Sequence, residues 1–143
     1  MACPDELWGE GPTPQAFWYL AYHTLFWLDF YMAGTPEGFA PRRLHTGRDG
    51  PGRRLSRPDL HESRATGVLE HSRRKCRATI AAMTDEQSAK PSGFQRLGLS
   101  HAELLLYNLR HVQHHVGQLQ LLLRQRSDSV PRWVGRTNVP LED

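Results

Sequence analysis

The segment that begins at Ser100 constrains the fold most strongly, because it carries the clearest helical pattern in the chain. Ser100 and Glu103 have the spacing of a capping box, in which two side chains satisfy each other's backbone donors at a helix start. The apolar residues that follow recur at alternating spacings of four and three, which predicts one continuous buried seam on a helix that ends near Arg126. These residues are Leu105, Leu109, Val112, Val116, Leu119 and Leu123. No stretch of the chain shows convincing strand alternation, so the prediction is an all-α fold.

Residues 16–34 form a very aromatic stretch, and they too are predicted to lie in a helix. Thr13 is a suitable cap for its start, because Pro14 is tolerated at the first helical position. The helix should end near Ala33, since Gly34 and then a proline follow. Apolar side chains occupy nearly every face of this helix, so we expect it to be buried on several sides.

A third helix is predicted from about Pro58 to Met83. Its expected inner side consists of Val68, Leu69, Cys76, Ile80 and Met83. Residues 34–57 are rich in Gly, Pro and Arg and are predicted to form a long surface loop. Residues 127–143 are predicted to form an irregular tail, in which we expect Trp133 to pack on the helices. A chain of 143 residues is long enough for one domain with its own core, so residues 1–143 are interpreted as a single helical domain.

The sequence favours a cytoplasmic protein. The stretch 16–34 is about as long as a membrane-spanning helix, which needs roughly 18 apolar residues. His23 and Asp29 lie within it, however, and each is costly at bilayer depth, so we expect no membrane insertion. Cys3 and Cys76 are far apart, which argues against a disulfide framework and against a cysteine-based zinc site. The basic region of a secretory signal is absent from the N-terminus.

Basic residues are concentrated in one part of the chain. Eleven of the 18 lie between positions 40 and 77, namely Arg42, Arg43, Arg48, Arg53, Arg54, Arg57, Arg64, Arg73, Arg74, Lys75 and Arg77. A nucleic-acid groove would need aromatic stacking partners among them, and this interval contains no Phe, Tyr or Trp. The block is therefore interpreted as a solvated surface, and nucleic-acid binding is not expected.

Three histidines are the candidate metal ligands. His111 and His115 are one helical turn apart, so their rings lie on the same side of the predicted helix. His23 lies inside the aromatic stretch, where an unpaired polar ring would be costly to bury. If the three rings converge, they leave a fourth coordination position open, as catalytic zinc sites do. His114 points away, and the histidines expected to be solvated are His45, His61, His71 and His101.

The same residues have a second interpretation. Histidines at a helix boundary often hydrogen-bond to neighbouring helices, and a core histidine bonded to a carbonyl would explain His23 equally well. In that case the protein would be a metal-free helical scaffold or interaction module with structural histidines. Both interpretations stay open on the evidence of spacing alone.

Residues 17–29 (FWYLAYHTLFWLD) and 107–119 (YNLRHVQHHVGQL) resemble the DinB family of four-helix bundles, and the resemblance extends from Trp8 to Arg126. It implies a DinB-like helical bundle with one divalent ion, nickel or zinc, held by His23, His111 and His115. Relatives include transferases and isomerases that use a low-molecular-weight thiol such as bacillithiol or mycothiol. The resemblance therefore implies a thiol-dependent S-transferase that acts on an electrophilic small molecule.

Asn108 and Gln118 are the candidates for residues that orient these ligands. At about 100° per residue, Asn108 lies on the same side of the helix as His115.

One part of the chain departs from the family pattern. The bundle normally has a helix before the one with the first histidine, and here a short stretch containing Pro and Gly precedes Thr13. We expect the family's first helix to be missing or truncated, which would leave apolar side chains of its neighbours without cover. The alternatives are a chain shortened at its start, which we favour, and a homodimer in which a partner subunit fills the gap.

Overall fold

The computed structural model describes residues 3–11, 14–41, 62–127, 130–133 and 135. Its helices are α1 (Asp5–Gly9), α2 (Phe17–Tyr31), α3 (Glu62–Ala82), α4 (Asp85–Ala89) and α5 (His101–Arg126), with a short 3₁₀ helix at Gln95–Leu97. No strand occurs in the described part of the chain. The predicted all-α fold is therefore confirmed. The basic block lies partly outside the described residues, which resume at position 62 after a gap that begins at 42.

Helix α5 begins where its sequence predicts. The Ser100 hydroxyl oxygen accepts a hydrogen bond of 3.3 Å from the Glu103 backbone N–H, and the Glu103 carboxylate accepts one of 2.8 Å from the Ser100 N–H. These reciprocal bonds satisfy two of the donors that every helix start leaves free. A second capping box, between Thr84 and Gln87, starts α4.

Helix α2 starts later than predicted. Ala16 is its extended N-cap residue, and no side chain caps the first turn. The proposed cap, Thr13, lies outside the described residues. The end of the helix is close to the prediction, because Gly34 adopts a positive φ of 74° that few other residues tolerate.

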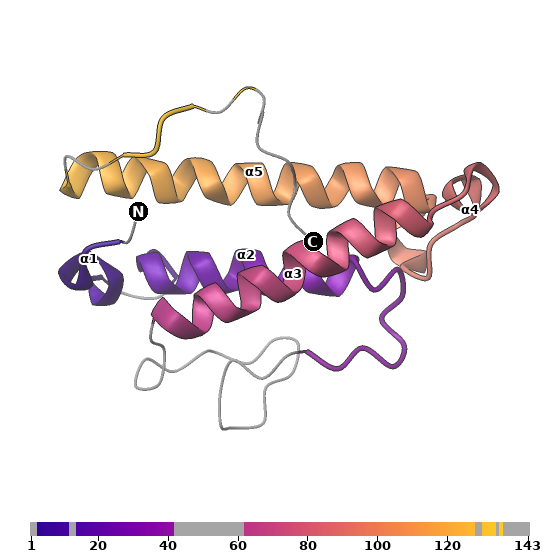
Figure 1. Ribbon diagram of the computed structural model, residues 1–143, viewed down its shortest axis with the longest axis horizontal. Coiled ribbons are helices and arrows are strands. Elements are labelled where there is room, and N and C mark those ends of the chain that lie inside the picture. Colours follow the sequence, from indigo (N-terminus) through magenta and orange to yellow (C-terminus); the bar gives the residue numbers. More distant parts are fainter. Residues whose placement is uncertain (1–2, 12–13, 42–61, 128–129, 134, 136–143) are drawn as a thin grey trace.

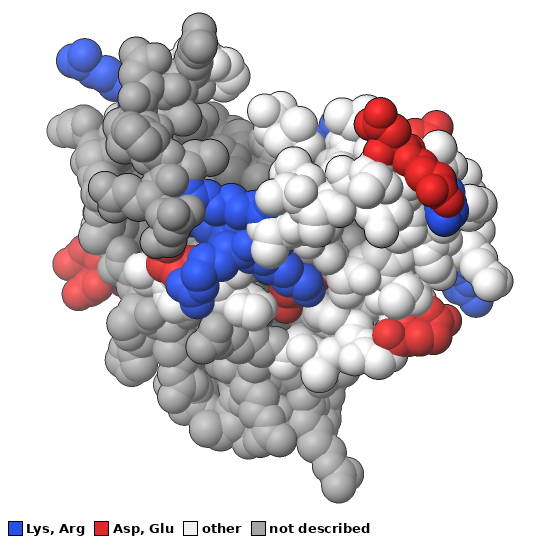
Figure 2. Space-filling view, turned by 45° about the vertical axis from the view of Figure 1, so that its right-hand side comes forward, with Lys and Arg blue, Asp and Glu red and all other residues white. Residues whose placement is uncertain are grey.

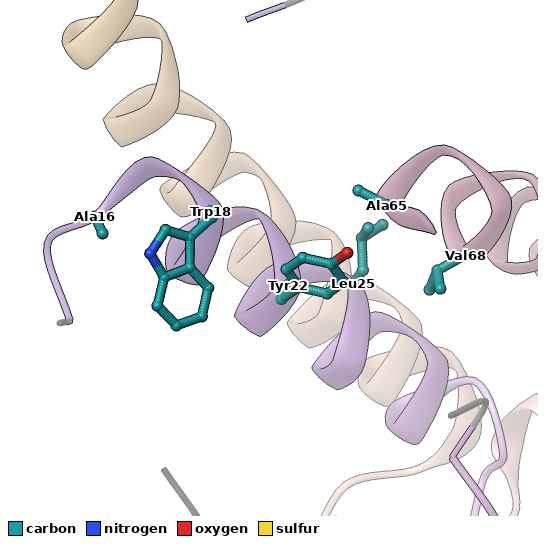
Figure 3. Close-up of a cluster of buried hydrophobic side chains, with 6 residues drawn as sticks. All are labelled: Ala16, Trp18, Tyr22, Leu25, Ala65 and Val68. Carbon is teal, nitrogen blue, oxygen red and sulfur yellow. The ribbon is translucent and has the colours of Figure 1, made fainter. Parts of the chain in front are cut away.

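Helix α2 is the central element of the arrangement. Helix α5 runs antiparallel along one side of it, α3 packs on another side, and the short α1 lies at its N-terminal end (Figure 1). A cluster of buried side chains comes from α2, the residue before it and α3, namely Ala16, Trp18, Tyr22, Leu25, Ala65 and Val68 (Figure 3). Trp8 of α1 packs against this cluster. A helix of only five residues thus precedes α2, where the sequence predicted the first helix to be missing or truncated.

The most deeply buried side of α5 lies next to the predicted seam, of whose six residues four are partly buried and two are exposed. Leu104 and Asn108 are each only 2% exposed, whereas Leu109 is 54% and Val116 39% exposed. The predicted buried side is therefore rotated about the helix axis by roughly one residue, or about 100°, from the side that is most buried. Apolar spacing identifies the apolar side of a helix, but the neighbouring elements decide which side is covered, and α2 covers the adjacent side.

Three other expected burial positions are also wrong. Leu69 and Ile80 of α3 are exposed, although Val68 is buried as predicted. Trp133 does not pack on the helices, since it is 84% exposed. The pattern of α3 is interrupted by charged residues, and only its first half lies against the α2 core cluster.

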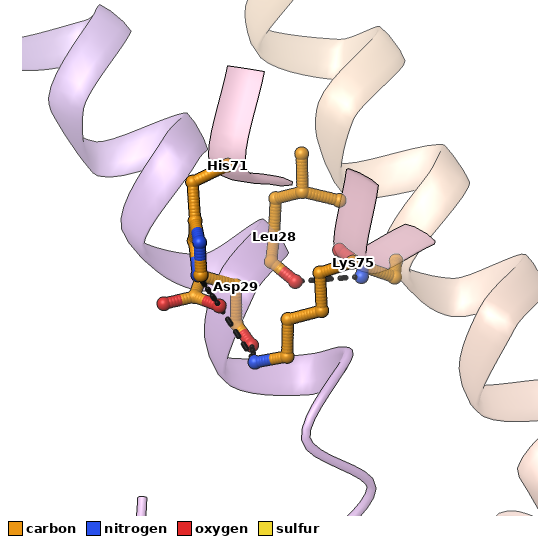
Figure 4. A network of polar contacts seen from close by, with 5 residues as sticks. Leu28, Asp29, His71 and Lys75 are labelled. Atoms are coloured by element: carbon orange, nitrogen blue, oxygen red, sulfur yellow. Dashed lines mark hydrogen bonds and ion pairs between the residues drawn. The ribbon is translucent and has the colours of Figure 1, made fainter. Parts of the chain in front are cut away.

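A buried ion pair ties α3 to α2 (Figure 4). The Lys75 ammonium donates to the Asp29 carboxylate at 2.6 Å and to the Asp29 carbonyl at 2.7 Å, and His71 Nε2 lies 3.6 Å from the same carboxylate. Asp29 is only 4% exposed, so the pair compensates a charge that would otherwise be costly to bury. Lys75 and His71 were expected to face solvent, and both instead lie partly buried beside Asp29.

The surface of the described residues carries charges of both signs. Figure 2 shows a group of Lys and Arg side chains with acidic side chains at its border. None of the described helices is both long enough and apolar enough to cross a membrane.

Candidate metal centre

The structure brings His23, His111 and His115 together between α2 and α5. Each offers one ring nitrogen such that the three atoms lie within 4.8 Å of one another, and all three residues are partly buried. The ring centroid of His23 is 5.3 Å from that of His111 and 4.7 Å from that of His115. The ring centroids of His111 and His115 are 4.6 Å apart, which follows from their spacing of one turn. The three predicted ligands thus share one site.

The register of the two helices explains this convergence. Asn108 Nδ2 donates a hydrogen bond of 3.1 Å to the Leu28 carbonyl oxygen, which fixes α5 relative to α2. Because the helices are antiparallel, stepping back from Leu28 to His23 corresponds to stepping forward from Asn108 to position 113. That position lies midway between His111 and His115, so His23 faces both of them.

The nitrogen geometry fits a shared ion. His111 Nε2 and His23 Nε2 are 3.4 Å apart. Two imidazole ligands of one tetrahedral zinc ion, each bonded at about 2.0 to 2.1 Å, would have their nitrogens about 3.3 to 3.4 Å apart. Two nitrogen lone pairs that face each other at this distance would repel without a proton or a cation between them.

Gln118 determines which nitrogen of His115 is free. Its Oε1 lies 2.7 Å from His115 Nδ1. An amide oxygen only accepts, so Nδ1 carries the proton and the neutral ring keeps the lone pair on Nε2. On its other side, the Gln118 amide nitrogen lies 3.4 Å from Nε2 of the exposed His114. His114 itself stays outside the group of three, as predicted.

The Asn108 amide bonds the backbone of α2 rather than a site histidine. Its Oδ1 and the Nδ1 of His111, one turn further along α5, are both buried without a hydrogen-bond partner among the described residues. Asn108 thus contributes to the register of the two helices. Its proposed role in orienting a ligand remains a prediction.

Burial keeps the imidazoles of His23 and His111 neutral. Burial is the main cause that lowers the pKa of His111 to about 4, and the nearby His115, His23 and His114 contribute in the same direction. Burial also lowers the pKa of His23, with a smaller contribution from His115. A neutral imidazole is the form that binds a metal, so His23 and His111 are ready to coordinate an ion at neutral pH without first losing a proton.

An aromatic row flanks the site, and its residues were not among the predicted site residues. Tyr19 stacks on His23 at 5.9 Å and Trp27 meets its edge at 6.1 Å, while Tyr31 lies 6.5 Å from His111. Burial, together with hydrogen bonding to Tyr107, raises the pKa of Tyr31, so its phenol stays protonated. Tyr19, His23, Trp27 and Tyr31 are each four positions apart, and this spacing indicates that they share one side of the helix.

The fold and the site define a class, namely a helical protein with a cluster of three histidines between two antiparallel helices. A family model described as the DinB superfamily matches residues 2–119, which is most of the chain. The chain therefore belongs to the DinB superfamily, and the expected resemblance is confirmed. Searches among curated proteins and among solved structures gave no match.

Proposed function

We propose that this protein binds one divalent metal ion, nickel or zinc, through His23, His111 and His115. The observation that carries the proposal is the convergence of the three ring nitrogens within 4.8 Å, with two Nε2 atoms at 3.4 Å. The lowered pKa values of His23 and His111 support it, because a proton competes weakly for these two nitrogens at neutral pH.

We further propose a thiol-dependent S-transferase that acts on an electrophilic small molecule. A three-histidine set leaves a coordination position open, and a divalent ion bound there would lower the pKa of a low-molecular-weight thiol enough to make it a nucleophile. Gln118 would hold His115 in the required tautomer, and Tyr19, Trp27 and Tyr31 would limit the access of water.

Metal analysis of the protein purified without a histidine tag tests the first step. We expect about one equivalent of nickel or zinc per chain, bound directly or after reconstitution. A protein that takes up no ion from added nickel or zinc would overturn the proposal. The result would then favour the alternative, a metal-free interaction module, which the exposed leucines of α5 also suit.

The thiol step has a separate test. In protein loaded with cobalt, a thiolate that joins the three histidines should add a sulfur-to-cobalt absorption band in the near ultraviolet. Bacillithiol, mycothiol and 2-mercaptoethanol are suitable probes. An unchanged spectrum at saturating thiol would reject the thiol-dependent reaction and would leave the metal site standing.

We propose the cytoplasm as the compartment. Cys3 and Cys76 are not joined in a disulfide, as a reducing environment would leave them. Burial raises the pKa of the Cys76 thiol, with opposing contributions from Lys75 and Asp29, so this residue is expected to be unreactive. Labelling the native protein with a maleimide should modify Cys3 faster than Cys76.

A further inference from the structure

Helix α5 has a long apolar side that lies next to its buried side and is only partly covered. We call it the outer face of α5, and it consists of the six residues of the predicted seam, Leu105, Leu109, Val112, Val116, Leu119 and Leu123. Leu109 is 54% and Val116 39% exposed, and the other four are partly exposed. Isolated exposed leucines are ordinary, but a continuous apolar row marks an interaction surface.

The described neighbours of α5 cover this face only in part. Leu105 and Leu109 directly follow the buried Leu104 and Asn108, so the outer face is turned about 100° around the helix from the buried side. The principal contacts of α5 are with α2 along its length and with α4 near its start. The metal-centre residues of α5 lie on the side toward α2, so an occupant of the outer face would leave them in place.

The spacing of the outer face is symmetric about position 114. The outermost pair of residues lies nine positions from it, the middle pair five and the inner pair two. A second copy of α5 that packs antiparallel, with a two-fold axis level with position 114, would place Leu109 opposite Leu119 and Val112 opposite Val116. A surface that matches itself in this way suits an isologous dimer.

The charges at the two ends of α5 favour the same arrangement. Glu103, whose carboxylate also caps Ser100, lies in the first turn, whereas Arg124 and Arg126 lie in the last turn, where Arg126 also pairs with Glu10. Antiparallel packing would bring the acidic first turn of one copy beside the basic last turn of the other, whereas parallel packing would bring like charges together at both ends. Antiparallel helix dipoles also attract each other. Charge and spacing therefore both favour a second copy of α5, packed antiparallel, as the occupant of the outer face.

We propose that two copies of this chain associate through the outer face of α5, antiparallel and about a two-fold axis level with position 114. This interface is independent of the proposed metal chemistry. It gives the apolar side of α5 the cover that the predicted buried seam required.

Sedimentation of the full chain tests the association. We expect a species of twice the 16.4 kDa chain mass at micromolar concentration. Leu109→Glu should raise the dimer dissociation constant more than about 10-fold, because a carboxylate would be buried opposite Leu119. The matched control is Leu121→Glu, since Leu121 is 52% exposed on the other flank of α5, and this variant should remain dimeric. A monomeric wild-type chain at about 100 micromolar would overturn the proposal, as would equal effects of the two variants.

Cross-linking tests the direction without relying on a destabilised variant. In a Cys3→Ser, Cys76→Ser background, the double variant Leu109→Cys, Leu119→Cys should form intermolecular disulfides on oxidation, because the two positions face each other across the interface. Leu109→Cys alone should not, because antiparallel packing would separate its two copies by about 10 residues, or about 15 Å along the helix. Cross-linking of the single variant as readily as the double variant, or of neither, would reject the antiparallel dimer.

Discussion

His115 Nδ1 donates a hydrogen bond of 2.7 Å to Gln118 Oε1, and this bond leaves Nε2 of His115 as the free lone pair at the site. Removing the acceptor should therefore weaken metal binding without removing a ligand. We expect Gln118→Leu to lower metal affinity about 10-fold to 100-fold. Competition with a chelator of known affinity measures the change. Gln118→Glu keeps an acceptor for Nδ1–H and should retain most of the affinity, so equal losses in both variants would argue against this role.

The neighbouring histidines provide a matched pair for testing the ligand set. His115 lies in the group of three, whereas the exposed His114 lies outside it and is next in sequence. We expect His115→Ala to lose about 90% or more of the bound metal and His114→Ala to keep it. The metal content of each purified variant, measured after reconstitution, gives the answer. Full occupancy in His115→Ala would show that the ion binds elsewhere.

The free energy of unfolding of the metal-free protein should decrease as the pH is lowered from 6.5 to about 4. The pKa of His111 is about 4 in the folded chain, against an ordinary value of 6.5. As the pH falls below 6.5 the unfolded chain takes up this proton first, so the free energy of unfolding decreases until the pH reaches about 4. Urea unfolding of the chelator-treated protein at several pH values measures this decrease.

The control for that experiment is His111→Leu. It removes the titrating group and should show a shallower dependence of stability on pH over the same window. If the two proteins lose stability in parallel between pH 6.5 and 4, burial of His111 does not penalise its charged form. His23 contributes in the same direction, since its pKa is also lowered.

Local signals explain what the sequence could predict. The start of α5 depends on Ser100 and Glu103, which are three residues apart, and the shared side of His111 and His115 depends on helix geometry alone. The convergence with His23 depends on the register of α2 and α5, which the family resemblance supplied. The match to the DinB superfamily model confirms the resemblance from which the convergence was predicted.

Features that depend on distant parts of the chain were mispredicted. Leu109 and Val116 have the spacing of a buried seam, but their burial requires a neighbour on that side of α5. Lys75 was assigned to the surface because its partner, Asp29, is 46 residues away in sequence. Helix α1 agrees with the predicted truncation of the first helix, but its five residues are too few for a periodic pattern to give its position.

The Lys75–Asp29 pair gives the largest predicted effect on stability. Lys75→Met would remove the cation and leave the carboxylate of Asp29, only 4% exposed, without its main partner. Breaking a buried pair in this way costs about 3 kcal/mol or more, and the nearby His71 would compensate only part of it. Chemical unfolding of the wild type and the variant measures the loss. The double variant Asp29→Leu, Lys75→Met removes both charges and should recover much of the stability. If the double variant is less stable than Lys75→Met by the full cost of Asp29→Leu alone, the two residues do not act as a pair.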